Sequence, residues 1–362
     1  MSLLKRTAPI LLAAAALLAP AAADAAWKVH GRGFGHGVGL SQYGAYGYAQ
    51  HGRSYREILG HYYSHTKVGK GAGGTVRVLL GSRNGSVRFR GSGSACGHKL
   101  NSRRRYSFAA GGGSIELRDS DGKRITGCGG EGKAGGGVLI DGFGRFRGQL
   151  VAHADGGELL VINAVGLEDY VKGVVPNEMP SSWPQDALRA QAVVARSYGL
   201  ATGQGGAFDQ YADTRSQVYG GKGSETKATN RAVEATRGEA VEYRGKVAVT
   251  YYFSTSGGQT EDARFGFSGG TAVPYLKSVK DPFDDISPVH TWTMRFSDEE
   301  MERELDGLFS GKLRKVDVVK TGRSPRIVRA RVVGSRGSSG VSGDTLRARL
   351  GLRSTWARFA HR

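Results

Sequence analysis

Short apolar runs separated by glycines fill residues 69–165 and restrict what this chain can fold into. The runs are rich in β-branched residues and alternate partly between apolar and polar positions; they read TVRVLLG, SVRFRG, SIELRD, RFRGQLVAH and ELLVINAV. Runs of this kind are typical of short strands, and the glycines between them mark turns. The sequence therefore predicts a β-rich region of hairpins here.

The pattern becomes helical from Gly166 onward. The clearest predicted helix covers 184–202, where a proline stands near the first turn and small residues form one stripe. A second helix is predicted over 226–237. Ser297 and Glu300 form a capping box before a further short helix, and strands follow it. The predicted fold class is α+β, with mixed β-sheets, a helical core and a β-rich inserted region.

The first 26 residues have the composition of a secretory signal peptide. Lys5 and Arg6 precede an apolar stretch, and Ala23-Asp24-Ala25 fits a cleavage site. The apolar stretch is roughly half of the about 20 residues that a membrane-spanning helix needs. We therefore expect an exported protein of the periplasm or the extracellular cell wall, without a stable membrane anchor.

Composition divides the chain into four expected units. They are a signal peptide (1–26), a glycine-rich segment with two short helices that packs onto the core (27–68), the β-rich region (69–165) and the core (166–362).

The formal net charge of +19 predicts an acidic partner. The basic residues are scattered and lack the aromatic interleaving of a single-strand binder, which argues against nucleic acid. Cell-wall polyanions are the expected partners of an exported chain, and a generally solvated basic surface is the alternative. Only Cys96 and Cys128 are present, and an oxidising compartment favours a structural disulfide between them. Their spacing matches no common zinc site, so we predict no metal.

Glycine stands at every second position from Gly31 to Gly39, around His36. Glycine allows left-handed backbone and close approach to another segment or a ligand. A dinucleotide-binding loop does not fit, because no strand and no long βαβ unit surround these glycines. Two readings stay open, a tight packing loop with a structural histidine and a binding loop.

Glu178 lies in an apolar, proline-rich turn just before the strong helix. Burial beside Met179 and Trp183 would raise its pKa, which suits a general acid near neutral pH. A capping or salt-bridged glutamate is the alternative. Arg189 and Arg196 lie seven residues apart on one face of the helix, so either could orient a carboxylate or a sugar.

A strand ending in a hydroxyl-rich turn covers 251–261. Its tyrosines, serines and threonines could bind sugar hydroxyls, although such residues also occupy ordinary strand ends. No G-x-S-x-G motif surrounds the serines, so a serine-hydrolase triad is not supported.

Together these segments resemble the SpoIID/LytB family. The resemblance rests on five pieces spread over most of the chain: GRGFGHGVGLSQYGA with SYREILGHYY, LEDYVKGVVPNEMPSSWPQDALRAQAVVARSYGLAT, DTRSQVYGG, VTYYFSTSGGQTE and SGDTLRARLGLRST. In the family's commonest arrangement the GHGVG-SQYGA piece closes the chain, whereas here it precedes the others. A circular permutation preserves a fold when the two ends are close. We therefore expect Trp27 to neighbour the residues near Ala360.

The resemblance implies lytic transglycosylase chemistry on peptidoglycan glycan strands, with the helical core as the catalytic part. Glu178 would be the catalytic acid and then the base, and no cofactor is implied. Arg196, Tyr43 and Tyr252 would line the site, with Tyr251 not excluded. The other polar residues proposed for substrate binding in the same motifs are His36, Gln42, Ser254 and Ser256.

Two other functions fit the same resemblance. The LytB branch resembles amidase enhancers, so the chain could be a non-catalytic regulator with a cell-wall amidase as its partner. A wall-binding protein held by its positive charge is the third possibility.

Overall fold

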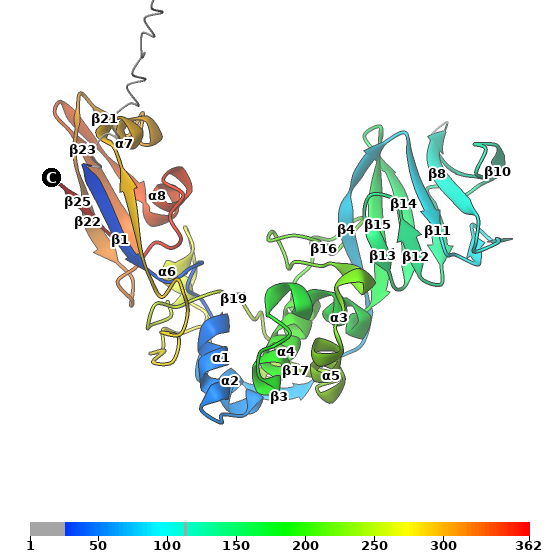
Figure 1. The fold of residues 1–362 in the computed structure, drawn as a ribbon, viewed down its shortest axis with the longest axis horizontal. Coiled ribbons are helices and arrows are strands. Elements are labelled where there is room, and N and C mark those ends of the chain that lie inside the picture. Colours follow the sequence, from blue (N-terminus) through cyan, green and yellow to red (C-terminus); the bar gives the residue numbers. More distant parts are fainter. Residues whose placement is uncertain (1–25, 112–113) are drawn as a thin grey trace, which may run out of the picture.

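The computed structural model describes residues 26–111 and 114–362. The predicted signal peptide, apart from Ala26, therefore lies outside the described residues. The predicted α+β class is confirmed. Figure 1 shows a β-rich body and a smaller β body on either side of a helical body, arranged like a V. How the chain divides into units at particular residues stays a prediction.

The β-rich body, called here the β-sandwich, consists of two packed sheets of short strands. The first sheet has the order β10 (Arg124–Gly127), β9 (Ser114–Arg118), β8 (Arg105–Gly111), β5 (Ser86–Arg90), β12 (Val138–Ile140), β13 (Gly144–Phe146). The second has the order β16 (Gln210–Tyr211), β4 (Thr75–Asn84), β15 (Glu158–Gly166), β14 (Gln149–Asp155), β11 (Glu131–Gly135), β6 (Ser94–Ala95), β7 (His98–Lys99). Neighbours are antiparallel, except that β16 runs parallel to β4.

Alternation along the strands explains how the β-sandwich closes. In β5 and β9 every second side chain is buried, so Phe89, Ile115 and Leu117 point into the space between the sheets. A disulfide joins Cys96, which follows β6, to Cys128, which follows β10. It ties one edge of the second sheet to one edge of the first. The pairing predicted from the sequence is present in the structure.

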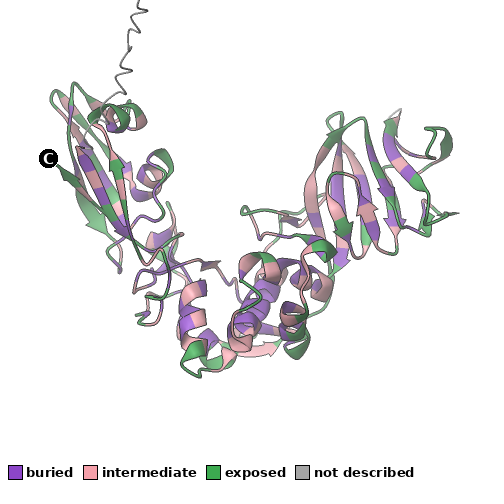
Figure 2. Ribbon diagram, viewed as in Figure 1, coloured by how far each residue is buried: buried purple, intermediate pink, exposed green. Residues whose placement is uncertain are grey.

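The helical body surrounds one long central helix, and Figure 2 shows this helix largely buried. Its helices are α1 (Gln42–Gln50), α2 (Tyr55–Tyr62), α3 (Leu167–Glu178), the central α4 (Gln185–Ala201) and α5 (Lys227–Ala235), with a short helix η1 (Gly221–Ser224) and a sheet β18 (Lys246–Val247), β17 (Glu239–Tyr243), β3 (Lys67–Lys70). The predicted helix over 184–202 is confirmed as α4. Its alanines let neighbouring helices approach on several sides, since all the other long helices pack against it.

The smaller β body, called here the terminal body, joins the first described strand to the last. Strand β1 (Trp27–Arg32) lies between β20 (Thr291–Phe296) and β25 (Ala357–His361). A second sheet has the order β21 (Phe309–Ser310), β24 (Gly337–Ser342), β23 (Ile327–Gly334), β22 (Leu313–Thr321), and the helices are α7 (Asp298–Glu304) and α8 (Gly343–Arg349). The predicted capping box before α7 is present.

The expected proximity of Trp27 and Ala360 is confirmed. In the antiparallel pair of β1 and β25, Trp27 faces His361 and Lys28 faces Ala360. The rings of Trp27 and His361 stack with their centroids 4.3 Å apart. Because the two ends of the described chain lie in one sheet, the altered order of the motifs is compatible with a preserved fold.

A parallel pair of very short strands connects the terminal body to the helical body. Strand β2 (Leu40–Ser41) pairs with β19 (Tyr252–Phe253). The short helix α6 (Ala263–Gly266) follows β19 in the chain. The glycine-rich segment leads into β2, and Gly39 has a φ of +78°. A Cβ at Gly39 would collide with the carbonyl oxygen of Tyr251, so close backbone packing requires glycine there.

Candidate functional site

Glu178 is the last residue of α3 and faces a pocket between the helical body and the terminal body. The pocket has a volume of about 540 Å³. It is lined by Phe34, Gly35, His36, Glu178, Tyr198, Thr214, Arg215, Ser216, Tyr251, Tyr252, Phe253, Ser254, Phe267 and Arg347. Glu178 is the only carboxylic acid in this lining, which limits the chemistry that the pocket can perform.

Burial raises the pKa of the Glu178 carboxyl group. Hydrogen bonds from the backbone of Val218 and from Gln42 lower the pKa, as does the nearby Tyr252 hydroxyl, and these effects offset that of burial only in part. The residue also ends a helix, where the partial negative charge of the helix dipole disfavours a carboxylate. Burial acts in the direction expected from the sequence, but Glu178 ends helix α3 and does not lie in the turn that the sequence suggested.

The two oxygens of the Glu178 carboxyl group have different partners. Oε1 accepts a hydrogen bond from the Val218 backbone N–H at 2.8 Å. Oε2 faces Nε2 of Gln42 at 3.4 Å, while the same Nε2 donates to the Glu178 carbonyl oxygen at 3.0 Å. Oε1 is thus held as an acceptor, and Oε2 is the oxygen better placed to carry the proton.

Tyr252 connects the pocket to the buried interior. Its hydroxyl donates to Oε1 of Gln217 at 3.1 Å, and Nε2 of Gln217 in turn donates to the Tyr170 hydroxyl at 2.9 Å. Burial, followed by the charge of Glu178, raises the pKa of Tyr252 well above its usual value, so the phenol stays protonated. Tyr251 lines the pocket as well.

His36 is fixed as a neutral imidazole. Its Nδ1 accepts the Val38 N–H at 3.0 Å, so its Nε2 carries the hydrogen and donates to the Tyr252 carbonyl oxygen at 3.1 Å. Burial first and then the charge of Arg347 lower the pKa of His36 to about 3. The ring lines the pocket and positions the Tyr252 backbone, which agrees with the structural role considered for His36; ligand binding by this loop stays a prediction.

Sequence reasoning missed the two arginines of the pocket. Arg347 comes from α8 in the terminal body, and its Nε donates to the Leu352 carbonyl oxygen at 3.3 Å. Burial lowers the pKa of Arg347, yet an arginine remains charged near neutral pH. Arg215 lies in the turn after β16 and pairs with Asp213 at 2.7 Å. Both stand within quoted motifs, but only the fold brings them into the lining of the Glu178 pocket.

Arg196 does not reach the pocket, and its predicted contact with substrate is corrected. The side chain is fully buried, and its guanidinium forms two hydrogen bonds to the Glu168 carboxylate at 2.9 and 2.8 Å. A further bond reaches the Glu239 carbonyl oxygen at 2.9 Å. The arginine faces inward because α4 is surrounded by other elements, so it joins α3, α4 and β17.

The remaining predicted contacts separate into two groups. Gln42 touches Glu178, and Ser254 lines the pocket. Tyr43 lies outside the lining; its ring packs edge-on against Trp183 at 4.9 Å, and its backbone N–H donates to the Ser254 carbonyl oxygen at 3.0 Å. Ser256 is fully buried, and its hydroxyl donates to Asp284 at 2.7 Å, so this residue is also corrected from a substrate contact to a structural one.

Within residues 26–111 and 114–362, no group of three or more His, Cys, Asp or Glu side chains could hold a metal ion. Over the same part of the chain, no helix is both long enough and apolar enough to cross a membrane.

The part of the chain that carries Glu178 is similar to known proteins. Residues 155–243 match the model of the stage II sporulation protein family, SpoIID. An uncharacterized protein of Brachyspira hyodysenteriae is 38% identical over 173 residues, which cover 47% of this chain and 46% of that relative. The amidase enhancer of Bacillus subtilis is 41% identical over 132 residues, covering 36% of this chain and 17% of the enhancer.

Stage II sporulation protein D of Bacillus amyloliquefaciens is 33% identical over 216 residues, which cover 53% of this chain and 60% of that protein. The chain thus spans less than two thirds of the length of each of these relatives. The matched segment includes α3, α4 and Glu178. Residues 155–243 are thus similar to the SpoIID family, and two of the relatives carry the names that the motifs predicted, stage II sporulation protein D and amidase enhancer.

Proposed function

We propose that this protein acts on the bacterial cell wall as an exported peptidoglycan lytic transglycosylase. Its substrate would be the bond between N-acetylmuramic acid and N-acetylglucosamine in glycan strands. The similarity to stage II sporulation protein D and to an amidase enhancer supports a role at the cell wall. The reaction itself is argued from the pocket around Glu178.

The observation that carries the proposal is a single carboxyl group with a raised pKa in the pocket. An ordinary glycosidase needs two carboxyl groups, one as acid and one as base or nucleophile. A lytic transglycosylase needs only one, because a hydroxyl of the substrate itself replaces the water. Such an internal nucleophile reaches effective concentrations on the order of 10⁵ to 10⁸ M. The lining of this pocket fits the second case.

Glu178 serves first as the acid. The protonated carboxyl donates from Oε2 to the glycosidic oxygen, the bond from this oxygen to the muramoyl C1 breaks, and the N-acetylglucosamine end leaves as an alcohol. Positive charge develops at C1 and its ring oxygen. The Glu178 carboxylate that results then stands beside this charge, held in place through Oε1 by the Val218 N–H.

Glu178 serves next as the base. Its carboxylate removes the proton of the muramoyl 6-hydroxyl, whose oxygen forms a bond to C1 and closes the 1,6-anhydro ring. The carboxyl group is again protonated, so one residue completes the cycle. Gln42 contacts this group, and the Arg347 cation, which lines the same pocket, can orient the lactyl carboxylate of a muramoyl sugar that carries no stem peptide.

Mass spectrometry of digested glycan strands in water enriched in ¹⁸O tests the proposal. We expect 1,6-anhydro-muramoyl ends without ¹⁸O from the native protein and at least about a hundredfold less product from Glu178→Gln. Glu158→Gln is the matched control, because this glutamate is exposed on β15 and outside the pocket. Incorporation of ¹⁸O would show hydrolysis, and undiminished product from Glu178→Gln would exclude this residue as the acid.

A second function is favoured by the match to the amidase enhancer of Bacillus subtilis. In this case the pocket would bind glycan without cleaving it and would help a cell-wall amidase to act. The same experiment distinguishes the two functions. No anhydro product from any strand, together with faster release of peptides by an added amidase, would support the regulator.

A further inference from the structure

A basic pocket lies where the first sheet of the β-sandwich meets the short helix η1. Its volume is about 600 Å³. Four cations from four segments line it: Arg90 at the end of β5, Arg103 in the turn before β8, Arg145 of β13 and Lys222 of η1. All four are exposed, and none of the described residues that line this pocket is acidic.

The register of the strands extends these cations into a row across the sheet. Arg90 stands opposite Arg105 of β8 on one side and opposite Leu139 of β12 on the other. Leu139 in turn stands opposite Arg145. Directly opposite residues share one face of a sheet, and this is the outer face, because the adjacent Phe89 is buried inside the β-sandwich. Three strand spacings separate Arg105 from Arg145, so the row is about 14 Å long.

The positive charge of this row is not balanced by the protein. Like charges directly opposite each other destabilise a sheet, and Arg90 and Arg105 form such a pair. Within residues 26–111 and 114–362, no carboxylate forms an ion pair with a cation of the row or of the pocket. Arg88, two residues before Arg90 on the same strand, does have a partner in Asp141 at 3.8 Å. An external anion would therefore offset a repulsion that the fold leaves in place.

Packing fixes η1 beside the row. Gly221 has a φ of +60°, and a Cβ there would collide with the Phe146 ring, so η1 lies directly on β13 and Lys222 stands next to the row. The other side of η1 is held by α3, because Nδ2 of Asn177 donates to the Ser224 hydroxyl at 2.9 Å. The basic pocket is thus a preformed junction between the β-sandwich and the helical body.

We propose that the basic pocket binds a linear phosphodiester polymer of the cell wall, a polyol phosphate chain, and so holds the protein on this polymer. A row of about 14 Å is longer than one anionic group and suits a chain with regularly spaced charges. Arginine and lysine both bind phosphate well, arginine with two parallel hydrogen bonds. The inference goes beyond the proposed function: it shares the location at the wall but does not depend on the reaction at Glu178.

Two other polyanionic partners fit the pocket less well. A membrane surface is usually bound through an exposed apolar face, and none of the exposed large apolar side chains of the described residues lines this pocket. Single-stranded nucleic acid is usually bound by stacking its bases on exposed aromatic rings. The one aromatic residue of the described lining, Phe146, is buried.

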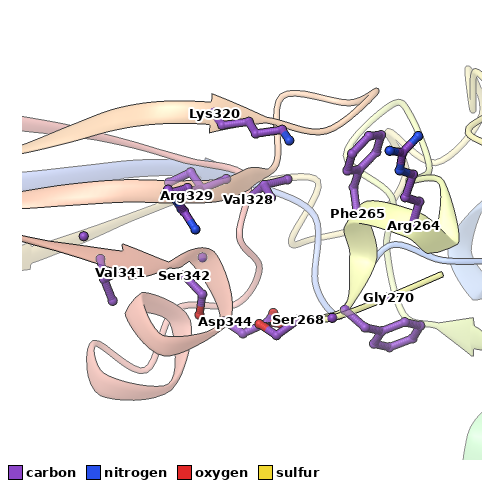
Figure 3. A pocket seen from close by; sticks show the side chains of 15 residues that line it. Arg264, Phe265, Ser268, Gly270, Lys320, Val328, Arg329, Val341, Ser342 and Asp344 are labelled. Atoms are coloured by element: carbon purple, nitrogen blue, oxygen red, sulfur yellow. Dashed lines mark hydrogen bonds between the residues drawn. The ribbon is translucent and has the colours of Figure 1, made fainter.

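A cleft of the terminal body supplies a matched control. Figure 3 shows it between α6 and the ends of strands, with Arg264, Lys320 and Arg329 among its lining residues. These three cations are exposed, and Lys320 stands opposite Arg329 in the sheet, so they resemble the row in charge and in local repulsion. The lining of this cleft differs by including a carboxylate, that of Asp344.

Fluorescence anisotropy of a labelled glycerol phosphate oligomer, titrated with the full chain at several salt concentrations, tests the inference. The pocket variant carries Arg90→Gln, Arg145→Gln and Lys222→Gln. The control variant carries Arg264→Gln, Lys320→Gln and Arg329→Gln and loses the same charge. The unlabelled competitors are the same oligomer, polyglutamate, single-stranded DNA of equal charge and phosphatidylglycerol vesicles.

We expect the pocket variant to bind the oligomer about tenfold more weakly, and the control variant to stay within about twofold of the native protein. The slope of log affinity against log salt concentration should fall in magnitude by about 2 in the pocket variant. Equal losses in the two variants would show an effect of net charge alone and overturn the inference. An unchanged affinity of the pocket variant, or better competition by polyglutamate, DNA or vesicles than by the oligomer, would overturn it as well.

This outcome is separable from that of the proposed function. The binding assay involves no turnover, and Glu178→Gln should bind the oligomer as the native protein does. A loss of binding in the pocket variant would stand even if no anhydro product is ever formed. Product formation that depends on Glu178, with no effect of the pocket variant on binding, would retain the enzyme and overturn the basic pocket.

Discussion

Replacing Arg196 with methionine should destabilise the fold rather than weaken substrate binding. The substitution keeps a long side chain on α4 but removes both bonds to Glu168 and the bond to the Glu239 carbonyl oxygen. Glu168 would keep only the Gly238 N–H, at 3.1 Å. Leaving one charge of a buried pair without its partner costs about 3 to 5 kcal/mol. Because the Glu168 side chain is 18% exposed, we expect the lower end, about 3 kcal/mol.

Urea unfolding followed by circular dichroism measures this loss as a lower midpoint with an unchanged slope. Adding Glu168→Gln to Arg196→Met should recover part of the stability, because the unpaired charge is then gone. Arg189→Met is the control on the same helix, since its side chain is 32% exposed and lies 3.4 Å from Asp186. It should cost less than about 1 kcal/mol.

A loss of glycan binding without a loss of stability would instead support Arg196 as a substrate contact. If Arg196→Met unfolded like the native protein but bound glycan strands much more weakly, the assignment of this residue to the structural interior would be refuted.

Three further predictions concern other parts of the molecule. Gln42→Leu removes a hydrogen bond that lowers the pKa of Glu178, so the high-pH limb of the rate profile should move to higher pH; a shift to lower pH would contradict this geometry. Burial raises the pKa of Asp281 to about 7, so its contribution to stability is present below pH about 4 and is lost as pH rises through 7. Asp281→Asn should therefore raise the free energy of unfolding in urea by up to about 4 kcal/mol at pH 8 and leave it unchanged at pH 4; an equal effect at both pH values would refute the argument. Replacing the Cys96–Cys128 disulfide, whose partners are 32 residues apart, with two serines should cost about 3 to 4 kcal/mol in thermal unfolding; an unchanged melting temperature would show that the link constrains little.

Much of the fold could be predicted because its signals are local. A stripe of small residues at helical spacing and a proline near the first turn are properties of one segment, so they predict α4 without knowledge of its neighbours. The capping box at Ser297 is likewise contained within four residues. The division into a β-sandwich and a separate terminal body was less visible, because β1 and β25 pair across almost the whole chain.

The site could be predicted only in part, and the errors have one physical cause. A motif identifies residues that matter, but it does not say which way each side chain points. Arg196 and Ser256 were expected to meet substrate, but packing turns both inward, Arg196 to the Glu168 carboxylate and Ser256 to the Asp284 carboxylate. Arg347 lies in a quoted motif that gave no sign of where its side chain points, and α8 brings it into the lining of the Glu178 pocket.

The sequence by itself determined the resemblance to a known family, the helix α4 and the choice of Glu178 as the candidate acid, since these depend on residue type and spacing. Only the tertiary structure decided that Glu178 is the one carboxyl group in its pocket, and that His36 is neutral beneath Tyr252. Both depend on which distant segments meet and how deeply they are buried. Burial sets the protonation of Glu178 and His36, and it follows from the packing of the whole chain.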